Sequence, residues 1–141
     1  MIKSGDRVFY KPEKDFRGVV LDYMLKTFAE KARVEIVKNK SKADRVAVAD
    51  TIDINSNIII NSLIKGKISD LGKLKPVNRK IIKPLYLFLD EEILLYAKIK
   101  KLKFVKKKIK QSKIGIFIDE LEKKHPEVKR AVINSYLELN N

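Results

Sequence analysis

Short apolar runs and amphipathic stretches, separated by polar turns, fill the first third of the chain. Residues 7–10 favour a strand, and Pro12 follows them as a breaker. Asp15 suits a helix N-cap, and the apolar residues after it recur every four positions, which predicts a helix to about Lys31. The residues on this repeating face are Val20, Met24 and Phe28. We therefore expect a strand followed by a helix that buries this face.

Two further strand-like runs and an ambiguous segment follow. Residues 34–37 are largely β-branched, residues 46–49 form an uninterrupted small and β-branched run, and residues 39–42 between them are typical of a turn. Residues 54–64 contain three consecutive isoleucines, which favour a strand. Their polar residues nevertheless recur at helical spacing, and Gly66 suits a helix C-cap. We predict a helix for this segment.

The remainder of the chain predicts one short extended piece and three helices. Residues 81–85 favour the extended piece. Acids at residues 90–92, with lysines about two turns later, match the dipole of a helix that begins there. A helix pair follows, over about 116–124 and 127–139, and His125 and Pro126 break it.

The order of these elements predicts the fold class. Strands and helices alternate over the first two-thirds, which indicates an α/β fold with a largely parallel sheet, whereas the last third is helical. No linker rich in glycine or serine separates the two parts. We therefore predict a single compact domain over residues 1–141, in which residues from about 115 to 141 form a helical appendage.

Composition favours a polyanion as the partner. The 141 residues include 32 lysines and arginines against 18 acids, for a net charge of +14. Such an excess is typical of nucleic-acid binders, and the alternative is the lysine-rich surface of a heat-stable protein. The chain has no cysteine, no signal peptide at its start and no apolar run long enough to cross a bilayer. We therefore expect a cytoplasmic protein that has no membrane segment, disulfide or cysteine-held metal.

Lysines are concentrated between residues 98 and 113, where no acid occurs. Lysine binds phosphates as a point charge, so structured RNA fits this segment better than a specific DNA sequence. The alternative is a solvated lysine-rich face. The candidate RNA-binding residues are Lys65, Lys98, Lys100, Lys101, Lys103, Lys106, Lys107, Lys108, Lys110 and Lys113.

Polar residues that follow the predicted strands are candidates for a second site. Ligands of open parallel sheets bind beyond the carboxyl ends of the strands. Lysines and helix starts suit a phosphate there, and carboxylates suit Mg²⁺ or a ribose hydroxyl. Besides the segment 38–42, the candidate nucleotide-binding residues are Lys14, Asp15, Asp50, Thr51 and Asp53. The alternative is that the three aspartates only cap helices.

An ordered series of segments resembles the PP-loop ATP pyrophosphatases of tRNA 2-thiolation. Residues 43–51 read ADRVAVADT, where that family has a strand of the type ADKLATGHN, and residues 63–66 read LIKG for its LLRG. Residues 82–85 read IKPL, as in the family, and residues 117–139 resemble its closing pattern. The resemblance spans residues 43–139. It implies a Rossmann-like, adenine nucleotide alpha-hydrolase-like fold, with ATP and Mg²⁺ as cofactors and tRNA as a partner.

The residues that carry the family's chemistry are missing. Where the family has the phosphate loop SGGKDS, residues 11–16 read KPEKDF, which keeps only Lys14 and Asp15. Pro12 removes a backbone donor and Glu13 brings a negative charge to this loop. The chain also lacks the cysteines that sulfur transfer or an iron–sulfur cluster needs. The resemblance therefore implies a degenerate member, similar to the non-catalytic subunit of the cytosolic tRNA thiolation complex.

Two main functions follow from these observations. The first is a protein without catalytic residues or a certain cofactor, which binds tRNA or regulates a catalytic PP-loop paralogue within a homo- or hetero-oligomer. The second is a compact ATP pyrophosphatase that adenylates a substrate without sulfur chemistry. That enzyme would use Lys14 and Asp15 at phosphate, and Asp50 and Asp53 at Mg²⁺ or ribose. A nucleotide sensor is a third, lower-ranked alternative.

Overall fold

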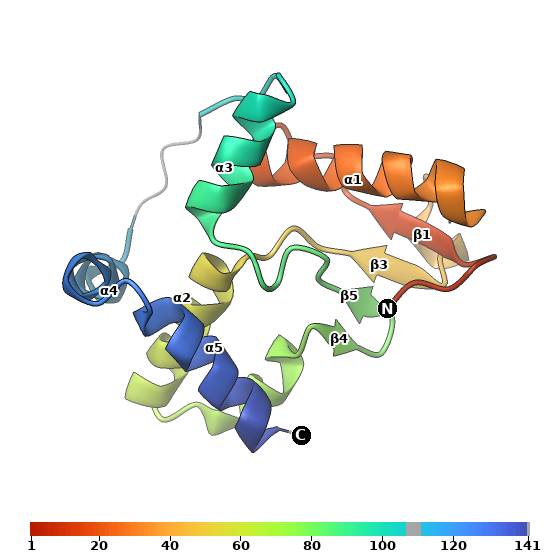
Figure 1. Cartoon of the computed structure of the whole chain (residues 1–141). Coiled ribbons are helices and arrows are strands. Elements are labelled where there is room, and N and C mark those ends of the chain that lie inside the picture. The colour runs from red at the N-terminus through yellow and green to blue at the C-terminus, as the bar shows by residue number, and fades with distance from the viewer. Residues whose placement is uncertain (107–110, 141) are drawn as a thin grey trace. The chain divides into compact units, whose positions relative to one another are not determined.

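The computed structural model describes residues 1–106 and 111–140 (Figure 1). The chain forms two compact units. Residues Met1–Thr51 and Pro76–Lys107 form one, the sheet unit, and residues Ile52–Lys75 and Lys108–Asn141 form the other, the helical unit. The helical unit therefore contains residues 52–75 besides the predicted C-terminal appendage.

The sheet unit is built on five strands in the order β2-β1-β3-β5-β4. All neighbouring strands are parallel except the last pair, β5 and β4, which is antiparallel. The strands are β1 (Arg7–Tyr10), β2 (Glu35–Ile36), β3 (Arg45–Ala47), β4 (Val77–Asn78) and β5 (Ile81–Ile82). The predicted α/β class with a mainly parallel sheet is confirmed. The strand β4 was missed because Val77 and Asn78 stand between Pro76 and Arg79 and form no β-branched or apolar run.

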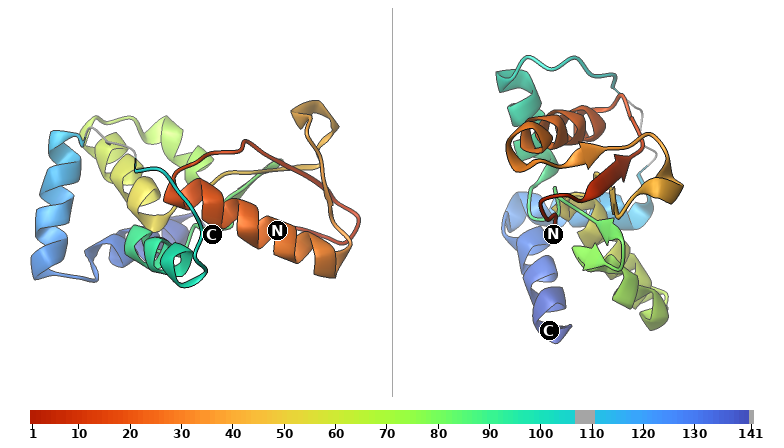
Figure 2. Two further views of the ribbon diagram at one scale, coloured as in Figure 1. Left: turned by 90° about the horizontal axis from the view of Figure 1, so that it is seen from above. Right: turned by 90° about the vertical axis from the view of Figure 1, so that its right-hand side faces the viewer.

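Two helices accompany the sheet. Helix α1 (Phe16–Ala32) follows β1, and α3 (Asp90–Ile99) packs against α1 (Figures 1 and 2). The predicted face of α1 is wrong at Phe28, which is exposed, because the buried residues follow the 3.6-residue period and not a strict spacing of four. These buried residues are Gly18, Val20, Leu21 and Leu25. Val20, Leu21 and Leu25 join a core that includes Val8, Ile82, Leu85, Ile93 and Ala97.

The helical unit contains α2 (Ile52–Ile64), the 3₁₀ helix η2 (Ile68–Leu74), α4 (Lys113–Lys124) and α5 (Val128–Leu139). Helix α2 ends as predicted, with Gly66 in the left-handed region at φ 68°. The amide of Lys67 donates to the Ser62 carbonyl at 2.9 Å and that of Gly66 to the Leu63 carbonyl at 3.2 Å. These two bonds are the Schellman pattern that favours glycine at this position.

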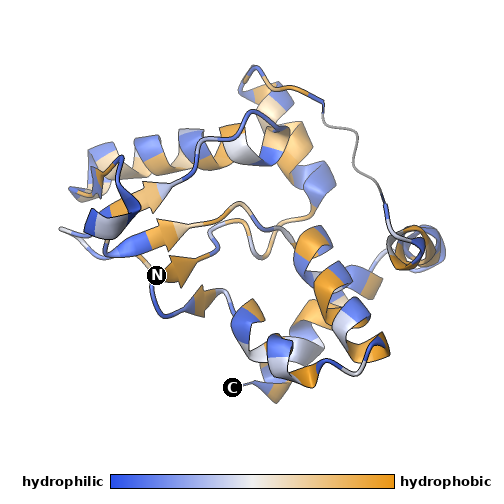
Figure 3. Cartoon of the chain, turned by 180° about the vertical axis from the view of Figure 1, so that it is seen from behind, coloured by the Kyte–Doolittle hydropathy of each residue, from blue (hydrophilic) through white to orange (hydrophobic). Residues whose placement is uncertain are grey.

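The strands and the helices differ in hydropathy. Figure 3 shows mainly apolar strands in the sheet, whereas the helices carry both apolar and polar residues.

Within residues 1–106 and 111–140, no helix combines the length and the apolar character that crossing a membrane requires.

Candidate functional site

Polar side chains gather at the carboxyl edge of the sheet. Parallel strands end at a common edge, so the residues that follow β1, β3 and β5 lie close together. Two of the predicted residues, Asp50 and Thr51, are bonded directly to side chains that the sequence analysis did not single out. The predicted Asp15 lies beside this group. We call this group the edge cluster: Asp15, Arg17, Asp50, Thr51, Lys83 and Asp90.

The buried Lys83 forms an ion pair with the half-buried Asp50 in this cluster. The Lys83 Nζ lies 2.9 Å from the Asp50 Oδ2, and Lys83 is only 6% exposed. A buried ammonium group needs a carboxylate, because desolvation otherwise disfavours the charge. Asp50, a candidate ligand for Mg²⁺ or ribose, is therefore bound to a lysine of the chain itself.

Asp90, the first residue of α3, is bound from two other elements. The Arg17 Nε donates to its Oδ1 at 2.8 Å, and the Arg17 Nη2 donates to its Oδ2. Such a two-pronged pair is the strongest arrangement of guanidinium and carboxylate. The fully buried Thr51 donates its hydroxyl to the same Oδ1 at 2.6 Å. Thr51 thus joins the end of β3 to the start of α3.

The N-terminus of α1, where a phosphate would bind, is occupied by its own cap. The Asp15 Oδ1 accepts the Gly18 amide at 3.0 Å. A Cβ at Gly18 would lie 2.6 Å from both the Cβ and the carbonyl oxygen of Glu13. The loop therefore packs directly on the first turn of the helix, and a bound anion would have to displace the Asp15 carboxylate.

Lys14 lies beside the predicted lysine segment. Its carbonyl accepts the Val105 amide at 2.8 Å, and the rings of Phe16 and Phe104 meet edge to face at 6.3 Å. The segment that follows α3 thus runs along the loop after β1. The exposed lysines of these two segments and of the last turn of α3 are Lys11, Lys14, Lys98, Lys100, Lys101, Lys103 and Lys106. We call them the lysine rim.

The other predicted residues lie elsewhere in the chain. Lys65 and Lys113 are exposed in the helical unit. Lys107, Lys108 and Lys110 fall outside the residues that the structure describes. The segment 38–42 leads back to the amino end of β1, because the Asp44 amide donates to the Arg7 carbonyl at 2.8 Å. Arg7 also binds the Asp44 carboxylate and holds the pKa of that group down to about 2.

Asp53 belongs to a separate cluster in the helical unit. The Lys129 Nζ lies 2.5 Å from Asp53, 2.7 Å from Glu122 and 2.9 Å from Asp119. Burial alone would lower the pKa of Lys129, but the hydrogen bonds to the three carboxylates outweigh it and raise that pKa above its usual value. In the part of the chain that the structure describes, no group of histidines and carboxylates is arranged to hold a metal ion.

Replacing Gly18 with alanine tests the packing of the loop on α1. Alanine in a helix interior is normally more stable than glycine by about 0.5–1 kcal/mol. Here the added Cβ would lie 2.6 Å from backbone, so we expect a loss of stability of about 1–3 kcal/mol. Denaturant unfolding measures this change. Gly72→Ala is the control, since no atom lies within 4 Å of its added Cβ. A Gly18→Ala variant as stable as the wild type would contradict the close packing.

Comparison with known proteins supports the fold. No protein-family model matches the chain, and no curated protein matches its sequence. A solved structure, the U34-tRNA thiolase NcsA from Methanococcus maripaludis with its [4Fe-4S] cluster, matches with a TM-score of 0.75 at 19% identity. The match covers 97% of this chain and 72% of that one. Such clusters are bound through cysteine thiolates, so this cysteine-free chain does not fit one. What the two proteins share is the Rossmann-like fold.

Proposed function

We propose that this chain is a catalytically degenerate PP-loop-like protein that binds tRNA and acts as a partner or regulatory subunit in tRNA 2-thiolation. One observation carries this proposal. The sheet edge where ligands of such folds bind is filled by the chain's own ion pairs, while exposed lysines run beside it.

The filled edge argues against nucleotide chemistry. To reach the sheet, a nucleotide would have to separate Lys83 from Asp50, or Arg17 from Asp90. Breaking these buried or half-buried ion pairs costs free energy that the nucleotide would have to supply from its own contacts. Millimolar to micromolar binding supplies only about 4–8 kcal/mol in total, so this cost weakens nucleotide binding.

The lysine rim supports RNA binding. Its lysines are exposed, and the sequence contains no acid between Lys98 and Lys113. Point charges of this kind contact phosphates and do not discriminate bases, as recognition of a folded RNA by its backbone requires. The thiolase that shares the fold is named for its tRNA substrate, which makes tRNA the first RNA to test.

The first experiment measures binding of a labelled tRNA transcript by fluorescence anisotropy at several salt concentrations. We expect saturable binding that weakens steeply as salt rises, and weaker binding of a DNA duplex of equal charge. A pull-down from the host should recover tRNA or a PP-loop paralogue. Recovery of neither, together with equal affinity for RNA and DNA, would contradict the proposal.

A calorimetric titration with MgATP tests the alternative enzyme. If the edge cluster excludes nucleotide, we expect no saturable heat. Saturable heat that Asp50→Asn removes, in a variant that remains folded, would favour the ATP pyrophosphatase. We choose Asp50 because Asp53 also holds the helical unit together through Lys129.

A further inference from the structure

Two half-buried tyrosines meet beside the lysine rim. The rings of Tyr23 on α1 and Tyr96 on α3 contact each other edge to face, with their centroids 6.2 Å apart. Arg17 and Asp90 are 73 positions apart, as are these tyrosines, so α1 and α3 run in the same direction through both contacts. The tyrosines lie six residues further along each helix, about 9 Å along its axis from the edge cluster. They are therefore separate from the edge of the sheet where related folds bind their ligands.

The remaining tyrosines of the chain differ from this pair, because they are buried. Tyr10, Tyr86 and Tyr136 are at most 7% exposed. Tyr96 also packs against the core, but it and Tyr23 both remain partly exposed. An aromatic ring that is held in place by packing and still partly exposed can stack on the flat face of an unpaired base, whichever base it is.

Lys100, a member of the lysine rim, stands next to both rings. Its Nζ lies 6.0 Å from the centroid of each ring, the outer limit of a cation–π contact, so the rings hold the ammonium group only weakly. The phosphate and the base of a nucleotide are joined through one sugar. One exposed ammonium group beside two aromatic rings can therefore contact both parts of the same nucleotide.

The acids next to these tyrosines are bound within the chain. Asp22 on α1 pairs with Lys26, whose Nζ lies 3.0 Å from the Asp22 Oδ2. Glu92, one turn before the tyrosine of α3, accepts the Leu89 amide at 2.9 Å. Each carboxylate is thus held by a partner other than Lys100, whose ammonium group stays available to a phosphate.

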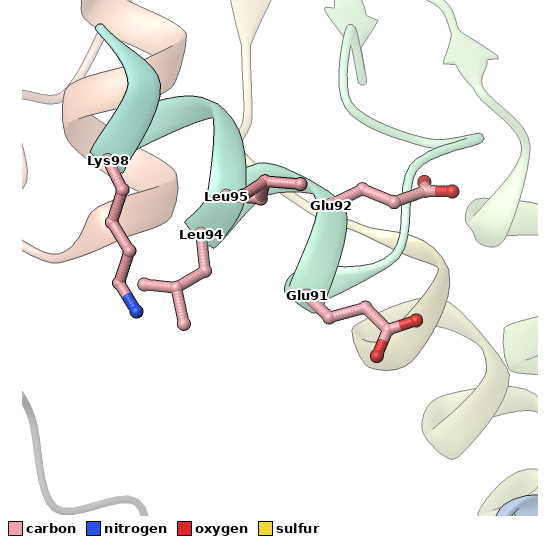
Figure 4. Close-up of a pocket in the computed structure, with 5 residues that line it drawn as sticks. All are labelled: Glu91, Glu92, Leu94, Leu95 and Lys98. Carbon is pink, nitrogen blue, oxygen red and sulfur yellow. The ribbon is translucent and has the colours of Figure 1, made fainter.

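We propose that Tyr23 and Tyr96 bind an unpaired base of RNA while Lys100 binds a phosphate of the same strand. The inference rests on the proposed RNA binding and adds the kind of RNA that the lysine rim takes. This RNA is a loop or a single strand, because the bases of a continuous duplex already stack on one another. A hollow elsewhere on α3 fits RNA less well, since the carboxylates of Glu91 and Glu92 line it beside two leucines and a lysine (Figure 4).

Tyrosine fluorescence tests this site, because the chain contains no tryptophan. A stacked base should quench the two half-buried tyrosines and leave the buried ones unchanged. We expect saturable quenching by a single-stranded oligouridine and much less by an RNA duplex of equal charge. The combined variant Tyr23→Phe, Tyr96→Phe should lose this quenching and keep its affinity, since phenylalanine retains the ring.

Removing the rings should weaken binding. Tyr23→Leu combined with Tyr96→Leu should reduce the affinity for the oligouridine by about tenfold, with an unchanged salt slope because no phosphate contact is lost. Lys100→Ala should instead lower that slope by about 0.7, the contribution of one phosphate in a single strand. Phe28→Leu is the matched control, since it removes another exposed aromatic ring of α1 and should leave oligouridine binding as in the wild type.

The possible results distinguish this site from the proposed function. Wild-type protein that binds neither the oligouridine nor tRNA would contradict RNA binding itself, and the base site with it. If tRNA binds, equal affinities of the leucine variant and the wild type for the oligouridine, or equal quenching by strand and duplex, would overturn only the base site. If the leucine variant does not fold, the phenylalanine variant decides, because quenching that persists in it cannot come from Tyr23 and Tyr96.

Discussion

Replacing Lys129 with alanine is expected to lower the free energy of unfolding of the helical unit by about 3–5 kcal/mol. Lys129 is 3% exposed, and its Nζ binds Asp53 of α2 together with Asp119 and Glu122 of α4. Without the ammonium group, the three carboxylates lose the lysine that they share. Because whole domains are stable by only about 5–15 kcal/mol, this loss is a large fraction of the total.

Hydrogen exchange followed by mass spectrometry measures this loss for each unit separately. Exchange should accelerate over residues 52–75 and 111–140 and stay slow in the core of the sheet unit. Lys124→Ala is the matched control, since Lys124 is an exposed lysine at the end of α4. Its substitution should cost less than about 1 kcal/mol. Equal effects of the two substitutions would show that the Lys129 cluster does not stabilise the unit.

The contribution of Lys129 to stability changes with pH in a direction that follows from its raised pKa. The pKa of Lys129 is raised above its usual 10.5, so its contribution to stability is complete below that pH and is lost only as pH rises through the higher folded value. The stability that this lysine adds, measured as the difference between the wild type and Lys129→Met, should therefore stay constant from neutral pH to about 10 and shrink only at higher pH. Denaturant midpoints across this range would measure the difference.

The fold was predictable from the sequence where the signals are local. Asp15 caps α1 and Gly66 ends α2 as expected, because each acts on backbone groups within a few residues. The ambiguous segment before Gly66 is a helix, as its polar spacing and glycine cap indicated. Phe28 shows the limit, since a strict spacing of four drifts away from the buried stripe of a long helix.

The sites were less predictable because their partners lie far apart in sequence. Arg17 and Asp90 are 73 positions apart, and Asp53 and Lys129 are 76 apart. In a lysine-rich chain, nothing in composition separates a buried lysine from an exposed one. Position could have done so: Lys83 directly follows a buried strand residue, and Lys129 shares a helical face with Ile133 and Tyr136, which are buried.

Reversing three charges of the lysine rim is expected to weaken tRNA binding by about a hundredfold or more at low salt. The variant combines Lys101→Glu, Lys103→Glu and Lys106→Glu, all at exposed positions of the segment beside Lys14. Each lysine that contacts a phosphate releases about one counterion when it binds. Removing three contacts should therefore reduce the slope of log affinity against log salt by roughly 2–3. Fluorescence anisotropy across a salt series measures both quantities.

A control variant with the same change of net charge distinguishes RNA binding at the lysine rim from general attraction of RNA to the basic protein. Lys31→Glu, Lys40→Glu and Lys42→Glu change the net charge by the same amount, at exposed positions outside the lysine rim. If RNA contacts the rim, this control should keep most of the wild-type salt slope and lose affinity only through the weaker overall field, since screening limits charges to about 10 Å at moderate salt. Equal losses in the two variants would mean that the whole basic surface attracts RNA. Because the rim adjoins the filled sheet edge, a loss confined to the rim variant would place RNA at the edge of the sheet where related folds bind their ligands.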